Sequence, residues 1–335
     1  MSTHNIEIIE IGDILPHPNP EVTRMELTNI WGWQCCIGKG QFKKGDRAIY
    51  IPPDFLVPLS HPLFKFLDKN IGKFQERIRV RRLKGVLSQG LLVQVPLELS
   101  NLPVGTNVIE RLGIERYEQP CEKNTSGLFV NGPSGLYTPK FDVENYQRYP
   151  DTFVNGEMVI VTEKIHGENG RFVYGQDKEG VWQQFCGSRT SWMAEDNKNI
   201  WWMTYGQNPQ IGNWCKDNPN KILYGEVFGQ VQDLKYSAKT NDIFCAIFAV
   251  LDKQTWVDFS EAFDSINKRG IKWAPILYHG PFSKDILTLA EGPSLWPNAN
   301  HIREGCVIVP GKERTNETLG RVCLKVVSNE YLERY

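Results

Sequence analysis

Residues 157–169 read EMVIVTEKIHGEN, and this stretch decides how the rest of the chain is interpreted. The apolar, β-branched run MVIV indicates a buried strand. The strand ends at Lys164, which opens the tetrapeptide Lys-Ile-His-Gly with His166 at its third position. From composition, a Lys-x-His-Gly match is expected in only about a few per cent of chains of this length. A lysine carried by this pattern at a strand end is therefore a candidate reactive group.

A lysine in such a place can attack the α-phosphate of a nucleotide, expel pyrophosphate and keep the nucleotide as a phosphoramidate. A free lysine with a pKa near 10.4 is neutral at pH 7 in only about one molecule in 2,500, a deficit of roughly 4.6 kcal/mol. Nearby cations and partial desolvation lower such a pKa, and Arg189 and Lys325 are candidate cations. The alternative is that Lys164 is an ordinary exposed lysine after a strand.

Long apolar runs continue after residue 151. They are KILYGEVFG (221–229), IFCAIFAVLD (243–252), GCVIVP (305–310) and RVCLKVVS (321–328). Between them, residues 257–269 are predicted to form a helix that begins near Ser260, because acidic and apolar residues follow this N-cap candidate. Strands of this length with helices between them predict an α+β domain built on antiparallel sheets, which we place at residues 141–335.

Short β-like runs separated by Gly, Pro and Asp dominate the chain before residue 135, among them WGWQCCIG and DRAIYIPP. Such spacing predicts a small barrel or sandwich, and the specific prediction is an OB-like β-barrel. Residues 115–150 are rich in Gly, Pro, Asn and Ser, which is typical of a linker. The first domain is therefore placed at residues 1–140, and a length of 335 residues is comfortable for two domains.

A basic run in the first domain, RIRVRRLKG, is the candidate nucleic-acid-binding element. Its arginines are Arg77, Arg79, Arg81 and Arg82. Their alternation with Ile78 and Val80 would place three guanidinium groups on one face of a strand and the aliphatic side chains in the core. Such a stripe can follow a phosphate backbone. The alternative, of equal weight, is the solvated outer face of an ordinary strand.

The bulk composition limits the class of protein. A formal net charge of -1, with 41% hydrophobic and 23% charged residues, is typical of a folded globular chain that would bind nucleic acid through a local patch. No secretory signal pattern and no run of 18 apolar residues occurs, so we expect an intracellular, cytoplasmic protein without a membrane partner, and a monomer. The eight cysteines lack CxxC spacing, which favours free thiols over disulfides or zinc.

Short motifs follow the lysine in a fixed order. They are Gly187-Ser188-Arg189-Thr190, Leu223 to Gly229 around Glu226, Phe244 to Phe248, Glu304-Gly305-Cys306-Val307 and Leu324 to Ser328 around Lys325. With TEKIHGEN, they resemble over residues 160–328 the motifs of the RNA-ligase branch of the covalent nucleotidyltransferases, which also include DNA ligases and mRNA capping enzymes. The histidine two residues after the lysine is typical of RNA ligases. The ending KVVS and the OB-like first domain resemble the Deinococcus- and Naegleria-type RNA ligases.

The resemblance implies an activity and its cofactors. It implies an ATP-dependent RNA ligase that joins 3′-hydroxyl and 5′-phosphate ends, in a nicked duplex or another arrangement, through a lysyl-AMP intermediate and an adenylylated RNA 5′ end. Lys164 would carry AMP beside Glu163 in the adenylate pocket, with His166 and Asn169 near the centre of phosphate transfer. Glu304 and Glu226 would serve Mg²⁺ or Mn²⁺, which prefer hard oxygen ligands.

The remaining roles follow from the same resemblance. Glu226 would hold the ribose hydroxyl, and Phe244, or alternatively Phe248, would stack on adenine, although core packing also explains an aromatic residue in an apolar strand. Arg189 would contact a phosphate of the nucleotide or of the RNA 5′ end, and Lys325 would contact the α-phosphate.

The chain departs from the family pattern at two positions, and two other classes of protein stay open. Ser188 stands where relatives often carry lysine, and Val327 stands where many carry a second lysine. One alternative is a noncatalytic RNA-binding protein with a retired nucleotidyltransferase domain. The other is a DNA ligase or guanylyltransferase of the same superfamily, against which His166 in place of aspartate argues.

Overall fold

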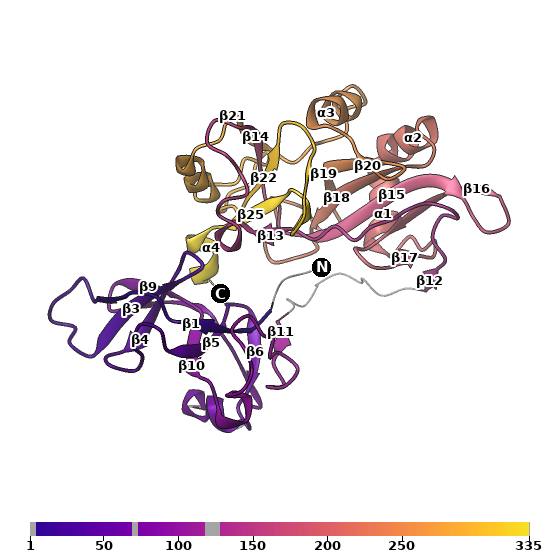
Figure 1. Ribbon diagram of the computed structural model, residues 1–335. Helices are drawn as coiled ribbons and strands as arrows, with labels where there is room; N and C mark the ends of the chain where they lie inside the picture. The colour runs from indigo at the N-terminus through magenta and orange to yellow at the C-terminus, as the bar shows by residue number, and fades with distance from the viewer. Residues whose placement is uncertain (1–4, 69–72, 118–127, 335) are drawn as a thin grey trace. The chain divides into compact units, whose positions relative to one another are not determined.

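The computed structural model describes residues 5–68, 73–117 and 128–334 (Figure 1). The chain forms two compact units, one of residues 1–119 with 329–335 and the other of residues 120–328. The sequence predicts a single boundary near residue 140 instead. Strands at Phe129–Val130 and Glu144–Asn145 add to sheets of the second unit, and the helix Asn329–Arg334 packs on the first. Turn-forming composition alone had marked these short strands as linker.

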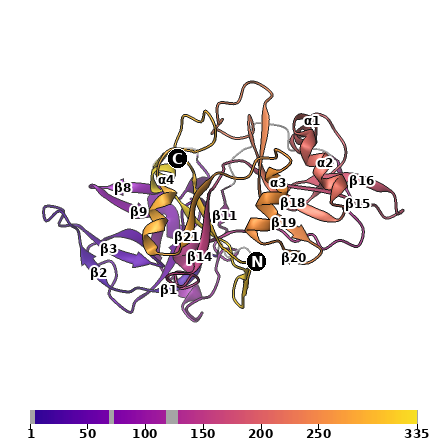
Figure 2. The ribbon, with the colours of Figure 1, turned by 90° about the horizontal axis from the view of Figure 1, so that it is seen from above.

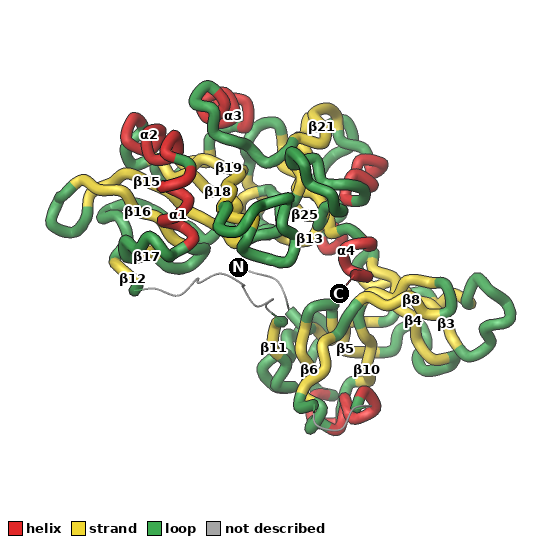
Figure 3. Tube along the Cα trace, turned by 180° about the vertical axis from the view of Figure 1, so that it is seen from behind, coloured by secondary structure: helices red, strands yellow, loops and turns green. Residues whose placement is uncertain are grey.

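The first unit is built from short antiparallel strands. Their bounds are β1 (Glu7–Glu10), β2 (Ile14–Pro16), β3 (Met25–Ile30), β4 (Trp33–Gly38), β5 (Arg47–Ile51), β6 (Phe55–Pro58), β7 (Gln75–Arg77), β8 (Val80–Leu83), β9 (Val86–Gln89), β10 (Leu91–Gln94) and β11 (Glu115–Arg116), with 3-10 turns at Pro62–Leu67 and Leu97–Leu99. They pair in the orders β1-β5-β10, β2-β3-β4, β11-β6-β7 and β8-β9. Figure 3 draws the strands in yellow and labels β3, β4, β5, β6, β8, β10 and β11 of this unit.

Strand β5 shows why this unit folds as predicted. Ile49 and Ile51 enter one hydrophobic core and Ala48 and Tyr50 another, because successive side chains point to opposite faces of a strand. The C-terminal helix α4 (Asn329–Arg334) returns to this unit, where Asn329 accepts a hydrogen bond from Gln89 at 2.8 Å. The end of the chain is thus part of the first unit.

The second unit contains two larger sheets. Its strands are β12 (Phe129–Val130), β13 (Glu144–Asn145), β14 (Met158–Glu163), β15 (Glu168–Gln176), β16 (Trp182–Gly187), β17 (Trp192–Met193), β18 (Lys221–Gly229), β19 (Ile243–Asp252), β20 (Thr255–Trp256), β21 (Ile276–Pro281), β22 (Gly305–Pro310), β23 (Thr315–Asn316), β24 (Gly320–Arg321) and β25 (Leu324–Val327). One sheet has seven strands, in the order β12-β17-β16-β15-β18-β19-β20, and the other has five, in the order β13-β25-β22-β14-β21.

Helices cover one face of the seven-stranded sheet. They are α1 (Ile200–Gln207), α2 (Pro209–Asp217) and α3 (Phe259–Asn267), and 3-10 turns lie at Tyr146–Arg148 and Lys284–Ala290. All three α-helices place side chains in one core with Leu223 and Val227 of β18, and Figure 2 shows α3 beside β18 and β19. Helix α3 confirms the helix predicted at residues 257–269. The described helices include none long and apolar enough to cross a membrane.

The tetrapeptide Lys164–Gly167 is the connection between the two sheets. Strand β14 of the five-stranded sheet ends at Glu163, and β15 of the seven-stranded sheet begins at Glu168. A Cβ atom at Gly167 would lie 2.4 Å from the carbonyl oxygen of Val227 and 2.8 Å from the Cβ of Phe228. Only glycine therefore lets the connection lie so close to β18.

The variant Gly167→Ala tests this constraint. Overpacking against a backbone carbonyl should cost about 1–3 kcal/mol and lower the melting temperature. The matched control is Gly206→Ala in α1, where an added Cβ meets nothing within 4 Å. That change should stabilise the helix by up to about 1 kcal/mol. A Gly167→Ala protein as stable as the unmodified chain would contradict the close approach.

Candidate active site

The Lys164 amine is held by a buried carboxylate. Its Nζ lies 2.7 Å from Oε1 of Glu304, whose side chain is only 12% exposed. Glu304 directly precedes β22, and the Lys164 amide donates to the carbonyl of Gly305 at 3.0 Å, so the two backbone segments are fixed side by side. Burial alone would raise the pKa of Glu304, but the charges of Lys164 and His166 and their hydrogen bonds lower it to about 2. Glu304 is therefore a buried anion.

His166 links Glu304 to a second carboxylate. Its Nδ1 lies 3.2 Å from Oε2 of Glu304, and its Nε2 lies 2.8 Å from Oδ1 of Asp233. Burial opposes the imidazolium charge, but hydrogen bonds to Asp233 and Glu304 outweigh it and raise the pKa of His166 to about 9. We call Lys164, His166, Glu304 and Asp233 the Lys164 cluster.

Three predicted adenylate residues share the sheet face opposite the helices. These residues are Asn169, Glu226 and Phe244. Asn169 of β15 pairs with Glu226 of β18, and Phe244 of β19 pairs with Phe228 of β18. Glu226 and Phe228 point away from the helices, because the alternate residues of β18 lie in the core with the helices. Burial raises the pKa of Glu226 to about 8, against the opposing charge of Lys164. The Oδ1 atom of Asn169 is buried without a hydrogen-bond partner in the described residues. This face can therefore accept hydrogen bonds from a ligand.

An aromatic group surrounds Phe244. The ring of Phe244 lies 5.7 Å from that of Phe228 and 6.0 Å from that of Trp296. Phe248 instead packs 4.6 Å from Phe141 in a separate core cluster, which favours Phe244 as the residue available to a base.

Glu163 forms hydrogen bonds to the loop that carries Trp296. Its carboxylate accepts hydrogen bonds from Ser294 Oγ at 2.5 Å and from the Leu295 amide at 2.7 Å. Desolvation raises the pKa of this carboxyl group. Glu163 thus anchors the loop that carries Trp296.

Two predicted phosphate contacts lie outside the Lys164 cluster. Arg189 forms an ion pair with Asp142 at 3.0 Å, in the turn that joins β16 to β17. Lys325 lies on β25 opposite Val307 of β22, on the sheet face that points away from the core containing Leu324. The ion pair of Lys164 with Glu304 stabilises the charged form of the lysine, whereas a neighbouring cation such as Arg189 or Lys325 would disfavour that form.

The arginines of the first unit are partly neutralised. Arg77 pairs with Asp54 at 2.6 Å and its guanidinium carbon lies 3.8 Å from the centre of the Tyr117 ring. Arg81 pairs with Glu76 at 3.5 Å and Arg82 with Glu333 at 2.6 Å.

Arg79 is exposed and forms no ion pair within the described residues. Ile78 and Val80 are buried, which confirms the predicted alternation of core and surface.

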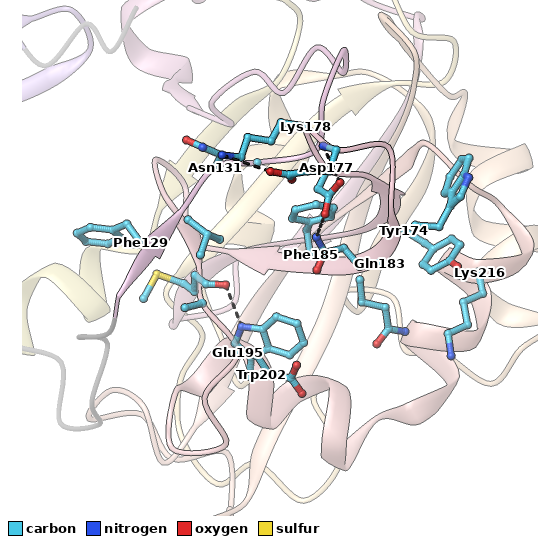
Figure 4. Close-up of a pocket in the computed structure, with 17 residues that line it drawn as sticks. Phe129, Asn131, Tyr174, Asp177, Lys178, Gln183, Phe185, Glu195, Trp202 and Lys216 are labelled. Atoms are coloured by element: carbon cyan, nitrogen blue, oxygen red, sulfur yellow. Dashed lines mark hydrogen bonds and ion pairs between the residues drawn. The ribbon is translucent and has the colours of Figure 1, made fainter.

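Neither a group of metal ligands nor the pocket described here coincides with the predicted site residues. The described residues contain no group of three or more His, Cys, Asp and Glu side chains arranged to hold a metal. A pocket of about 900 Å³ lies between β12, the β15–β16 hairpin, α1 and α2 (Figure 4). It is lined by aromatic rings and by more acidic than basic side chains, and by none of the predicted site residues. The Lys164 cluster is therefore the stronger candidate for nucleotide chemistry.

The seven described cysteines are free, as predicted, and Cys121 lies outside the described residues.

Family comparison agrees with this geometry. The profile of the RNA ligase family matches residues 157–327, just over half of the chain, and an OB-fold domain profile matches residues 7–96. The chain belongs to the RNA ligase family. The predicted OB-like first domain and antiparallel nucleotidyltransferase fold of this RNA ligase are confirmed.

Solved structures extend the likeness to the whole chain. A variant of Naegleria gruberi RNA ligase is 28% identical, with a TM-score of 0.83 and coverage of 99% of both chains. Variants of the same ligase solved with AMP and Mn and with ATP and Mn match at 28% identity, TM-scores of 0.82 and 99% coverage of both chains. No curated protein sequence matches this RNA ligase significantly.

Sequence reasoning missed three residues of this RNA ligase. Asp233 and Tyr236 contact His166, and Trp296 packs against the aromatic group around Phe244. Asp233 and Tyr236 lie in the polar segment QVQDLKYS between two apolar strands, which carries no spacing signal. A tryptophan in the loop LWPNAN was the one visible cue to Trp296.

The raised pKa of His166 predicts a pH-dependent contribution to stability. Because the folded pKa is above the ordinary value, this contribution is fully present below 6.5 and is lost as the pH rises through about 9. In metal-free buffer, the melting-temperature difference between the unmodified ligase and His166→Gln should therefore shrink across this range. His279→Gln, at an exposed histidine of β21, is the control. A difference that grows with pH would contradict the assignment.

Proposed function

We propose that this RNA ligase consumes ATP and joins 3′-hydroxyl to 5′-phosphate RNA ends, with Lys164 carrying AMP between the steps. The observation that carries the proposal is the Lys164 amine held 2.7 Å from the buried Glu304, at the connection between the five-stranded and the seven-stranded sheet. The related Naegleria gruberi structures with ATP, AMP and Mn support the choice of nucleotide and metal.

The residues on the open face of the seven-stranded sheet fit an adenosine. The buried, unpartnered Oδ1 of Asn169 needs a hydrogen-bond donor. The carboxylate of Glu226, beside it, forms no hydrogen bond or ion pair within the described residues. Ribose hydroxyls can satisfy both acceptors, while Phe244 and Trp296 offer rings for the base.

A divalent metal would be held by Glu226 and Glu304, which supply the hard oxygen atoms that Mg²⁺ and Mn²⁺ prefer. When bound, it would supply positive charge that screens the triphosphate and competes with the Lys164 ammonium for Glu304. The chain supplies two carboxylates at this place and no larger ligand set in its described part, so substrate phosphates and water would complete the coordination.

The proposed reaction has three transfers. The unprotonated Nζ of Lys164 attacks the α-phosphorus of ATP, and pyrophosphate leaves. An oxygen of the RNA 5′-phosphate then attacks the AMP phosphorus, and the lysine nitrogen leaves and regains a proton. Finally the RNA 3′-hydroxyl attacks the activated 5′-phosphate and AMP leaves. Lys325 and Arg189 would stabilise the phosphate charges, and Arg189 would exchange Asp142 for a phosphate.

The RNA partner would engage the first unit through its exposed basic residues. Arg79 is the strongest candidate because Arg77, Arg81 and Arg82 each have an acidic partner. Free cysteines support a reducing, intracellular location for this reaction.

The covalent step is tested by intact-protein mass spectrometry after incubation with ATP and Mg²⁺ or Mn²⁺, without RNA. The unmodified ligase should gain the mass of one AMP group, and Lys164→Ala should gain none, because Lys164 supplies the amine beside Glu304. Lys178→Ala, at a lysine whose side chain is 71% exposed, is the matched control and should be labelled normally. Labelling with GTP instead, or no labelling of the unmodified ligase, would contradict the proposal.

The RNA-binding role of Arg79 is tested by affinity as a function of salt. Arg79→Ala should weaken RNA binding and reduce the slope of log affinity against log salt by about 0.7–0.9, with no change in melting temperature. Arg77→Ala is the contrast: its side chain is only 14% exposed and paired with Asp54, so its loss should lower the melting temperature. An unchanged salt slope in Arg79→Ala would rule out a phosphate contact there.

A further inference from the structure

A loop outside the sequence motifs contacts the nucleophile segment at three points. This loop, residues 230–237, follows β18 and is called the clamp loop here. Its Gln232 donates to Glu168 Oε1 at 2.7 Å, and its Asp233 lies 2.8 Å from His166 Nε2. The hydroxyl of its Tyr236 accepts the backbone N–H of His166 at 2.8 Å. Both the backbone and the ring of His166 are therefore bound by the same loop.

Two residues of the clamp loop have an unfavourable backbone conformation. Tyr236 has φ of 51° and Ser237 has φ of 58°, and neither residue is a glycine. Left-handed conformations at such residues are unfavourable and persist where the surroundings enforce them. Here the Tyr236 ring lies 4.7 Å from Phe228 and 4.5 Å from His301, and only 1% of the residue is exposed. Packing therefore fixes the tyrosine hydroxyl in place.

The contacts continue from the clamp loop to the amine. Asp233 holds Nε2 of His166, and this fixes the ring so that Nδ1 faces Glu304 at 3.2 Å. The other oxygen of Glu304 lies 2.7 Å from Lys164 Nζ. The contacts of Asp233 and Tyr236 with His166 thus restrict where the Glu304 carboxylate can lie beside the Lys164 amine.

We propose that Asp233 and Tyr236 are positioning residues for adenylyl transfer: by fixing the ring and the backbone of His166, they hold Glu304 and the Lys164 amine in the geometry for attack. This inference rests on the proposed role of Lys164. Misplacing a reacting group by about 1 Å costs on the order of 100-fold in rate, and loss of a residue that orients a functional group costs about 10- to 100-fold.

The test measures single-turnover formation of the AMP adduct over a range of ATP concentrations. Tyr236→Phe removes only the hydroxyl and Asp233→Ala removes the carboxylate. Each should slow the maximal rate by about 10- to 100-fold and change the half-saturating ATP concentration by less than about threefold. Asp233→Asn retains an oxygen that can accept from Nε2, and it should recover most of the rate lost in Asp233→Ala.

Matched controls remove the same groups elsewhere. Tyr278→Phe removes a hydroxyl that donates to the Pro281 carbonyl, and Asp252→Asn removes a carboxylate paired with Lys221 at 3.0 Å. Both should react at the unmodified rate. Melting temperatures of all variants are recorded, and rates are expressed per folded protein, so that a loss of folding is not counted as a loss of rate.

The outcomes separate this inference from the proposed function. If Lys164→Ala still forms the adduct, the proposed function fails. If Lys164→Ala is inactive but Tyr236→Phe and Asp233→Ala react at the unmodified rate, the positioning inference alone is overturned. It is also overturned if these variants raise the half-saturating ATP concentration but keep the maximal rate, or if they lower the melting temperature but keep the maximal rate. It is overturned as well if Asp233→Asn is as slow as Asp233→Ala.

Discussion

The second unit depends on the ion pair between Lys164 and Glu304. A buried carboxylate is costly unless it is paired, and Glu304 is paired with both Lys164 and His166. The ion pair joins the end of β14 to the start of β22 and lies where the chain crosses from the five-stranded to the seven-stranded sheet. The Lys-x-His-Gly and Glu-Gly-x-Val motifs are thus the two halves of one electrostatic site.

This interaction also sets the chemical problem that the enzyme must solve. Glu304 stabilises the ammonium form of Lys164, whereas attack on phosphorus requires the free amine. His166 already takes one oxygen of Glu304, and a divalent cation at Glu304 would weaken the hold on Lys164 further. The same carboxylate would then hold the lysine in place before the nucleotide binds and release it when the charges of the substrate and metal arrive.

Much of this arrangement could be predicted from the sequence, because apolar runs indicate the strands and the motifs lie within these strands or directly beside them. The shared face of Asn169, Glu226 and Phe244 follows from strand periodicity once the pairing is known. The clamp loop could not be predicted, because its contacts depend on left-handed residues and on packing between segments distant in sequence. The hydrogen bonds of Glu163 to Ser294 and Leu295 could not be predicted either, because the loop that carries these two residues is about 130 positions away in the sequence.

The central claim is that the Lys164 nitrogen becomes bonded to the phosphorus of AMP at this crossing. It is tested most directly by a crystal structure of the enzyme after reaction with ATP and Mn²⁺. The account predicts continuous density from Nζ of Lys164 to a phosphorus atom, with the ribose near Glu226 and the base against Phe244. AMP bonded to another residue, or a Lys164 nitrogen directed to solvent away from bound nucleotide, would contradict it.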